Sequence, residues 1–364
     1  MNLNFGNILN PFNKVLYPQG FFYALVGDKG MILTNILGPN VISRFYFAEP
    51  TQSNLEKIAG VLKRRPKAPL YIVACHSDQE FKLQNMPSIN VMATGSLIQK
   101  RLEREFSYDA LKRAMFQKYD DNNRKVLIYL FIACTFSEQL NKWYSALNSL
   151  TYRISSLLLL PLESTTLMKK LHEHYFVIPK NEAARIQILI TEHKVSGIRI
   201  TVFDNQQLFF TRVLKEETNQ YHDVLAGNIQ HEINATIEFL KRSGMDLGGD
   251  LDVIVIVEKP IKIKLRNHRL KVKSFTLLTP YEAAKSLGLD GAVKEEDRFS
   301  DLLITAAINT SRKTFPIHTR EIVITKSLFQ ASTLLKYGAR LLIVYTLIML
   351  ALNSFSYISN KNKY

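Results

Sequence analysis

Cysteine is scarce in this chain, with two residues among 364. Cys75 and Cys134 each lie inside an apolar run typical of a strand, YIVAC and LFIACTF. Such positions suit reduced, buried thiols better than a disulfide framework, so the chain is not a disulfide-stapled scaffold and a reducing compartment is favoured. His76 follows Cys75, but adjacent strand residues point to opposite faces, so we do not expect a nucleophile with its base.

The sequence motifs of metal and hydrolytic sites are also missing. There is no His-Glu-x-x-His, no paired Cys-x-x-Cys and no Gly-x-Ser-x-Gly. His172 and His174 diverge by roughly 200° on a helix and cannot converge on one ion. We therefore expect these two, with His193 and His222, to be surface histidines, and we expect neither a metal site nor a catalytic residue.

Acidic residues are outnumbered, with 32 Asp and Glu against 47 Lys and Arg and a net charge of +15. This balance predicts attraction to an acidic surface, and charge alone does not separate anionic lipid from nucleic acid. Hydrophobic residues make up 46% of the chain and charged residues 22%. The composition supports a folded core, and the length favours two subdomains.

An uncharged run of membrane length occurs at residues 341–360, LLIVYTLIMLALNSFSYISN. A helix rises 1.5 Å per residue, so twenty residues can cross a hydrocarbon core of about 30 Å. A buried core helix is the alternative, but few soluble helices are apolar on every face. The run predicts one membrane-spanning helix over residues 339–360, preceded by a juxtamembrane linker helix over residues 319–338.

The orientation of this helix is inferred from the other end of the chain. Asn4, Asn7 and Asn10 interrupt the apolar core that a secretory signal needs. The basic residues that flank the apolar run barely favour either orientation. We therefore expect residues 1 to about 335 in the cytoplasm and the last four residues across the membrane.

Two distant segments, near residues 21–75 and 186–257, share one order of elements. Each has three strands in a meander, a helix and a buried strand. The strands read FFYALV, MILTNIL and VISRFYFA in the first segment, and RIQILIT, IRITVF and LFFTRVL in the second. This repeated unit predicts a mixed α/β fold with two related halves.

The remaining segments add further elements. The sequence predicts strands in KVLIYLFIAC and YRISSLLLLPL, a mostly helical stretch over residues 88–121, and helices near residues 137–150, 162–175, 281–287 and 299–308. We divide the chain into an N-terminal segment over residues 1–18 and two subdomains over residues 19–180 and 181–318.

The segment KPIKIKLRNHRLKVKSF is the most basic in the chain. Its alternation of apolar and cationic residues predicts an edge strand guarded by lysines, or a site for an acidic partner or lipid headgroups. Nucleic acid is not favoured, because the interleaved aromatic residues that stack on bases are missing. This basic patch comprises Lys262, Lys264, Arg266, Arg269, Lys271 and Lys273.

The repeat, together with four sequence segments, carries a resemblance to a known family. The segments are GIRITVFDNQQLFFTRVL, HEINATIEFLKRSG, TPYEAAKSLGLDG, and QLNKWYSALNSL before YRISSLLLLPLE. With the late apolar run, the chain resembles the actin-like cytoplasmic proteins of type IV pilus assembly and the L-type inner-membrane protein of type II secretion. The resemblance implies a duplicated ribonuclease-H-like (actin-like ATPase) fold with two facing subdomains, followed by one C-terminal transmembrane helix.

In that family, the hairpin turns after the first strand of each half point at the nucleotide phosphates. By resemblance, the nucleotide-binding candidates are Asp28, Lys29 and Gly30 in the first half and Ser196 and Gly197 in the second. The second turn has no Asp-x-Gly, and Asp with Gly is also common in a plain hairpin turn. We expect a degenerate, non-hydrolysing fold with no cofactor, although the family's ATP-Mg stays an alternative.

The resemblance implies a scaffold rather than an enzyme. It would be a single-pass protein of the bacterial inner membrane, with a pilus or secretion ATPase and a second bitopic platform protein as partners. The L-type proteins carry a domain beyond the spanning helix, whereas four residues follow the run in this sequence, and this departure puts the family's periplasmic interactions in doubt. The rival functions are an active actin-like ATPase and a membrane-tethered nucleic-acid binder.

Overall fold

The computed structural model describes residues 20–352 except 89–90, 121–122, 124, 151, 153, 177–185, 215–221, 246, 248–250, 267–271, 312–313, 320–321, 325–326, 328–334 and 336–337. The chain forms two compact units, Met1–Ile317 and His318–Tyr364. The further division of the first unit into two subdomains stays a prediction.

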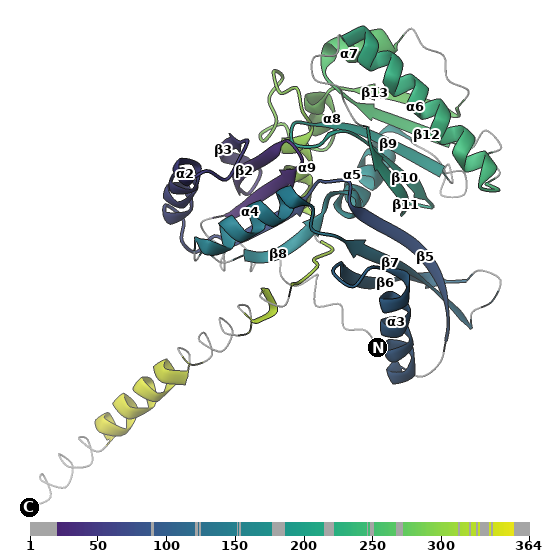
Figure 1. The fold of residues 1–364 in the computed structure, drawn as a ribbon. Coiled ribbons are helices and arrows are strands. Elements are labelled where there is room, and N and C mark those ends of the chain that lie inside the picture. The colour runs from purple at the N-terminus through teal and green to yellow at the C-terminus, as the bar shows by residue number, and fades with distance from the viewer. Residues whose placement is uncertain are drawn as a thin grey trace, which may run out of the picture. The chain divides into compact units, whose positions relative to one another are not determined.

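The first sheet of unit 1 has the strand order β3-β2-β1-β4-β8 (Figure 1). Strands β1, β2 and β3 form an antiparallel meander, and β4 and β8 run parallel to β1. Two helices accompany the sheet, and Thr51 and Ser137 cap their N-termini. The elements are β1 (Phe21–Gly27), β2 (Gly30–Leu37), β3 (Asn40–Phe47), α2 (Gln52–Lys63), β4 (Leu70–Ala74), α4 (Glu138–Ser149) and β8 (Ile154–Leu159).

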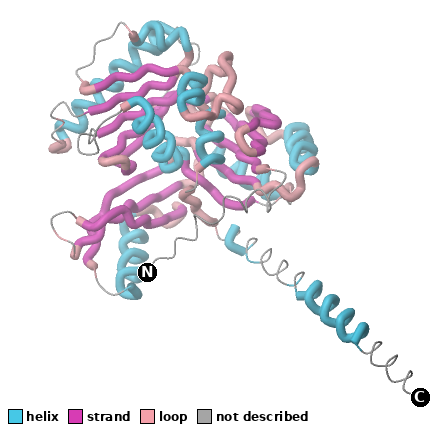
Figure 2. The backbone as a smooth tube through the Cα atoms, turned by 180° about the vertical axis from the view of Figure 1, so that it is seen from behind, coloured by secondary structure: helices cyan, strands magenta, loops and turns pink. Residues whose placement is uncertain are grey.

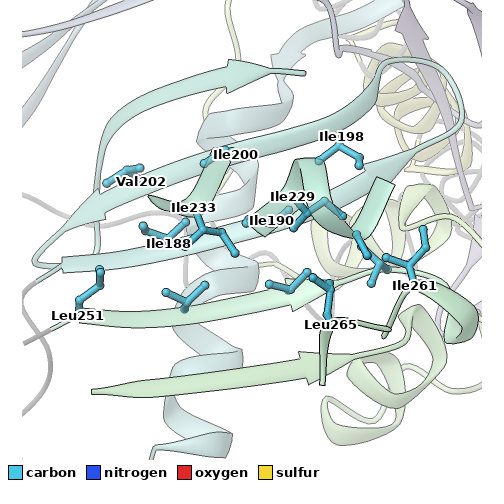
Figure 3. Close-up of a cluster of buried hydrophobic side chains, with 14 of the residues drawn as sticks. Ile188, Ile190, Ile198, Ile200, Val202, Ile229, Ile233, Leu251, Ile261 and Leu265 are labelled. Atoms are coloured by element: carbon cyan, nitrogen blue, oxygen red, sulfur yellow. The ribbon is translucent and has the colours of Figure 1, made fainter. Parts of the chain in front are cut away.

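The second sheet repeats this arrangement with the order β11-β10-β9-β12-β13. Its apolar side chains pack on α6, with Ile188 and Ile190 facing Ile229 and Ile233 (Figure 3). Burial of such side chains is the main stabilising contribution to this layer. The elements are β9 (Ile186–His193), β10 (Gly197–Asp204), β11 (Gln207–Val213), α6 (His222–Arg242), β12 (Leu251–Ile256) and β13 (Ser274–Leu278).

The predicted repeat of three strands, a helix and a strand is therefore confirmed. We refer to residues 20–176 as the first half and residues 186–310 as the second half. Helix α5 (Leu160–Tyr175) contacts strands of both five-stranded sheets (Figure 1). Figure 2 shows the strands in magenta and the helices in cyan from the opposite side. Helices α8 (Pro280–Ser286) and α9 (Asp301–Thr310) contact each other, and α9 also contacts β1 and β2.

A third sheet, β5-β7-β6, is inserted in the first half and packs on α3 (Val91–Glu105). Its strands are β5 (Gln79–Pro87), β6 (Leu111–Tyr119) and β7 (Val126–Cys134). The prediction of a mostly helical stretch over residues 88–121 is correct for α3 and wrong for β6. The segment LKRAMFQKY forms a strand because it pairs along the full length of β7.

The prediction of an edge strand at Lys262 to Arg266 is wrong, because this segment belongs to a helix, α7 (Lys259–Leu265). Pro260 occupies the first turn, where it costs no hydrogen bond. Ile261 and Leu265 are buried four residues apart, whereas Ile263 is 52% exposed. The apolar and cationic residues alternate along the sequence, but the buried residues repeat at the spacing of a helix and not at that of a strand.

Two of the described residues of the basic patch are paired with carboxylates. Lys262 is buried and its Nζ lies 2.5 Å from Glu282 Oε2, while Lys264 Nζ lies 2.8 Å from Asp223 Oδ1. Arg266 is exposed, and Lys273 donates its backbone N–H to Leu251 O. Arg269 and Lys271 lie outside the described residues.

Unit 2 contains a helix over residues 338–352 whose described side chains are exposed. Within the described part of the chain, no helix is long and apolar enough to cross a membrane. Residues 353–360 of the predicted span lie outside the described residues, as do the N-terminal residues 1–18.

Candidate functional site

The β1–β2 turn carries the first three candidate residues. Asp28 and Lys29 are exposed at its tip. Gly30 has φ 129°, a backbone conformation that residues with a side chain rarely adopt. A Cβ at this position would also lie 2.4 Å from Phe47 O, so both the conformation and the contact require glycine. The Tyr46 hydroxyl donates to Lys29 O at 2.5 Å and fixes the turn.

The β9–β10 turn carries the other two candidates. Ser196 is buried, and its Oγ has no partner among the residues that the structure describes. Gly197 has φ 79°, which favours glycine. Lys194 N donates to Asp301 Oδ2 at 2.9 Å, so the N-terminus of α9 holds this turn in place.

The two turns contact each other directly. Lys29 N donates to Val195 O at 2.9 Å, and a Cβ on Gly27 would lie 2.3 Å from the same oxygen. Lys194 Nζ also lies 4.1 Å from the ring centroid of Tyr46. The fold therefore brings all five predicted residues to one place, but at this point the turns leave no space between them.

A buried arginine beneath the turns links the two halves. Arg199 on β10 is 1% exposed, and its guanidinium donates to Cys75 O at 2.6 Å, His76 O at 3.0 Å and Thr211 Oγ1 at 3.1 Å. Burial lowers the pKa of Arg199 to about 10. Arg199 is not among the residues predicted from the sequence, although a charged residue inside the apolar strand IRITVF is a usable signal of such a role.

A pocket of about 200 Å³ lies in the second half, where β12 and β13 end and α7 and α8 begin. Arg298 and Lys259 are its cations, and Arg298 already pairs with Glu258 at 3.2 Å and with Glu192 at 3.0 Å. Five carboxylates line the pocket: Glu258, Glu282, Glu295, Glu296 and Asp297. This lining favours cations over a polyanion.

The expectation of surface histidines is wrong for two of the four. His172 is buried with Nε2 3.0 Å from Asp252 Oδ2, and His193 is buried with Nε2 2.8 Å from Thr191 Oγ1. His193 Nδ1 also lies 3.4 Å from Asp301 Oδ1. No group of three or more His, Cys, Asp and Glu side chains within the described ranges could hold a metal ion.

Both cysteines are free and buried, as predicted. Burial raises the pKa of each thiol, that of Cys134 to about 12. His76 Nε2 lies 2.9 Å from Thr135 O and 3.9 Å from Cys134 Sγ. Neither thiol is therefore an activated nucleophile.

Comparison with solved structures identifies the fold. A structure titled as the PilM-PilN type IV pilus biogenesis complex matches with a TM-score of 0.52 and 13% identity, over 80% of this chain and 98% of that chain. This chain therefore shares its duplicated α/β fold with a chain of that complex. At this identity, the match shows the fold alone.

Two further structures are similar at lower scores. The cytoplasmic domain of EpsL, an inner membrane component of the type II secretion system of Vibrio cholerae, has a TM-score of 0.43 and 10% identity, over 83% of this chain and 99% of that one. A Bacteroides thetaiotaomicron protein with an actin-like ATPase fold and unknown function matches with a TM-score of 0.39 and 10% identity, over 77% of this chain and 98% of that chain. No protein-family model and no curated protein matches the chain. The resemblance expected from the sequence is thus confirmed at the level of the fold.

The contact between the turns gives a testable prediction. We expect Gly27→Ala to lower the free energy of unfolding by about 1–3 kcal/mol, because the new Cβ overlaps a backbone oxygen that cannot move without the turn. Gly60→Ala on α2 is the matched control. Its Cβ meets no atom within 4 Å, so alanine should leave stability unchanged or raise it. Urea unfolding of both variants measures the difference, and equal stabilities would contradict the close contact.

Proposed function

We propose that the chain is a membrane-anchored cytoplasmic scaffold of a type IV pilus or type II secretion inner-membrane platform, and that it does not hydrolyse ATP. The observation that carries the proposal is the hydrogen bond from Lys29 N to Val195 O. A backbone amide that would face a phosphate in a nucleotide site is here bonded to the opposite turn. The two halves are therefore joined at the place where a nucleotide would separate them.

The other residues near the turns do not fit ATP with its magnesium ion. A triphosphate needs several cations or amides around its oxygens and a carboxylate that holds the metal or its waters. Lys29 and Asp28 supply one cation and one carboxylate on the exposed tip of one turn. At the other turn, Lys194 Nζ lies over the ring of Tyr46, and Asp301 already accepts a hydrogen bond from Lys194 N. The pocket beside β12 and β13 adds carboxylates, which repel phosphate. The chain is best suited to holding partners.

Membrane anchoring is supported by the helix over residues 338–352. Its exposed apolar side chains are Leu341, Leu342, Ile343, Val344, Tyr345, Leu347, Ile348, Met349, Leu350 and Leu352. A helix that is apolar on every face is stable only when something covers it, and a lipid bilayer does so. We propose that the anchor extends through residue 360 in the bacterial inner membrane, with the large unit in the cytoplasm.

The proposed partners are a pilus or secretion ATPase and a second bitopic platform protein. The likeness to a chain of the PilM-PilN complex supports a role in assembling other components. In such a role, the joined halves serve as a rigid frame, because no nucleotide cycle moves them.

Nucleotide binding tests the proposal. We expect ATP with magnesium to leave the thermal midpoint of the full-length protein unchanged, because a ligand that does not bind the folded state cannot stabilise it. The measurement is thermal unfolding in detergent, followed by the fluorescence of Trp143, the single tryptophan. A midpoint that rises with ATP concentration, together with magnesium-dependent turnover that Asp28→Ala abolishes, would overturn the non-hydrolysing scaffold.

A further inference from the structure

Strand β6 is an open edge of the third sheet. Among the described residues, β7 is the strand that pairs with β6, and α3 is the other main neighbour of β6. An edge strand directs every second N–H and C=O away from its partner strand, and these groups can pair with an added strand. At nine residues, β6 is long enough to form several such hydrogen bonds.

The other sheet edges are shorter or already engaged. Ile317 pairs with β8, and β11 and β5 contact each other. On β3, Arg44 pairs with Asp297 at 2.8 Å, and the Tyr46 hydroxyl donates to Lys29 O. The outer strand of the second sheet, β13, has five residues. Within the part of the chain that the structure describes, β6 is therefore the edge best suited to accept another strand.

An exposed aromatic cluster lies near the end of β6. Phe116 and Tyr119 are 47% and 55% exposed. Their ring centroids lie 5.4 Å apart, and the ring of Phe116 lies 5.6 Å from that of Tyr129 on β7. Phe116 and Tyr129 are direct cross-strand partners, so these two rings share one face of the sheet. Grouped, exposed aromatic side chains are typical of a surface that another protein covers.

The hairpin of β6 and β7 is basic. Residues 111–134 contain five Lys and Arg against two Asp, and neither strand contains an acidic residue. Lys112 and Lys118 lie opposite Ala133 and Ile128 of β7, positions that face opposite sides of the sheet. An added strand would therefore meet positive charge on either face. Lysine by itself discourages edge pairing, but the exposed rings beside it favour contact with a partner.

We propose that β6 binds an extended acidic segment of a partner protein, which adds to the third sheet as a fourth strand. Main-chain hydrogen bonds supply the affinity. Specificity comes from carboxylates beside Lys112 and Lys118 and from apolar side chains on the aromatic cluster. A second copy of β6 fits less well, because it would place lysines opposite lysines. The inference agrees with a scaffold that holds partners, but it requires neither the membrane anchor nor the absence of ATP hydrolysis.

The experiment measures binding of the full-length protein in detergent to a fluorescent peptide as long as β6, in which Glu and Val alternate. Matched peptides carry Gln or Lys in place of Glu. Two further peptides carry N-methyl groups on the Val residues only or on the Glu residues only. Because alternate N–H groups of an extended strand point to the same side, one set faces the edge of β6 and the other faces solvent. Fluorescence anisotropy gives the Kd of each peptide.

We expect the Glu peptide to bind about tenfold more tightly than the Gln peptide and the Lys peptide not to bind. One methylated peptide should lose binding, and the other should keep it, because only one set of N–H groups donates to β6. Lys112→Glu with Lys118→Glu should weaken binding of the Glu peptide by about tenfold, since each change replaces an attraction with a repulsion. Phe116→Ser with Tyr119→Ser should weaken it by about fivefold.

The matched control is Lys57→Glu with Lys63→Glu, which changes the net charge equally on exposed residues of α2. The control should bind the Glu peptide like the parent protein, and thermal unfolding verifies that every variant is folded. Equal binding of the two methylated peptides would overturn strand addition. Equal weakening by the control and by the β6 lysine variant would overturn the assignment to β6.

A single-stranded oligonucleotide serves as the competing ligand. If it bound more tightly than the Glu peptide and the β6 lysine variant released it, the surface would belong to nucleic acid and the proposal would be overturned. A Glu peptide that does not bind would overturn the proposal as well. Neither result would affect the anchor or the non-hydrolysing scaffold, because their tests do not involve β6.

Discussion

Replacing Arg199 with alanine is expected to lower the free energy of unfolding by about 3–5 kcal/mol, one of the two largest effects that we predict. The guanidinium is fully buried and satisfies the carbonyls of Cys75 and His76 in the first half. Alanine would leave both oxygens buried without a donor and would open a cavity between the halves. Urea unfolding followed by Trp143 fluorescence measures the loss, because Trp143 is buried in α4 of the first half.

Arg44→Ala is the control for this prediction, since Arg44 also links the halves. Its Nη1 lies 2.8 Å from Asp297 Oδ1, but the arginine side chain is 46% exposed. Exposed ion pairs contribute about 1 kcal/mol or less, so this variant should remain close to the parent protein. If Arg199→Ala cost no more than Arg44→Ala, the buried link would not hold the halves together.

The second large effect concerns the pH dependence of stability and Glu163 on α5. Burial raises the pKa of this carboxyl from its ordinary 4.5 to about 8, against the smaller lowering effects of the Phe315 N–H and of nearby Arg113. Between pH 4.5 and 8, Glu163 loses its proton in the unfolded chain and keeps it in the folded protein. The folded state then loses about 1.4 kcal/mol of stability for each pH unit of rise.

Glu163→Gln should remove this dependence of the free energy of unfolding on pH. Glutamine mimics the protonated acid and keeps an oxygen for the Phe315 N–H, so the variant should match the parent protein near pH 4.5 and be several kcal/mol more stable near pH 8. Glu173→Gln is the control on the same helix, because Glu173 is exposed and only 4.0 Å from Lys169. Urea unfolding at pH 5, 6, 7 and 8 checks the prediction. Parallel curves for the parent and Glu163→Gln would contradict it.

The parts of the fold that the sequence predicted are those with a local signal. The two repeats were visible because turn residues and strand alternation lie within a few positions of each other. Helix α8 was predicted in the same way, and its Thr279 and Glu282 form a capping box.

The parts that the sequence missed depend on distant partners. Strand β6 is a strand because β7 pairs with it, and α7 is a helix because Ile261 and Leu265 bury together. His172 is buried because Asp252, 80 positions away, accepts its hydrogen bond. A single sequence does not show which of these distant residues will be in contact in the folded protein.

The sequence by itself determined the repeated α/β pattern, the buried cysteines, the excess of positive charge and the apolar run at residues 341–360, because each depends on composition or on spacing along a short segment. Only the tertiary structure decided that Lys29 bonds Val195 and that Arg199 joins the halves. It also decided that Lys262 is buried and paired with Glu282. These outcomes depend on contacts between residues far apart in the chain, and such contacts exist only after the two sheets have packed.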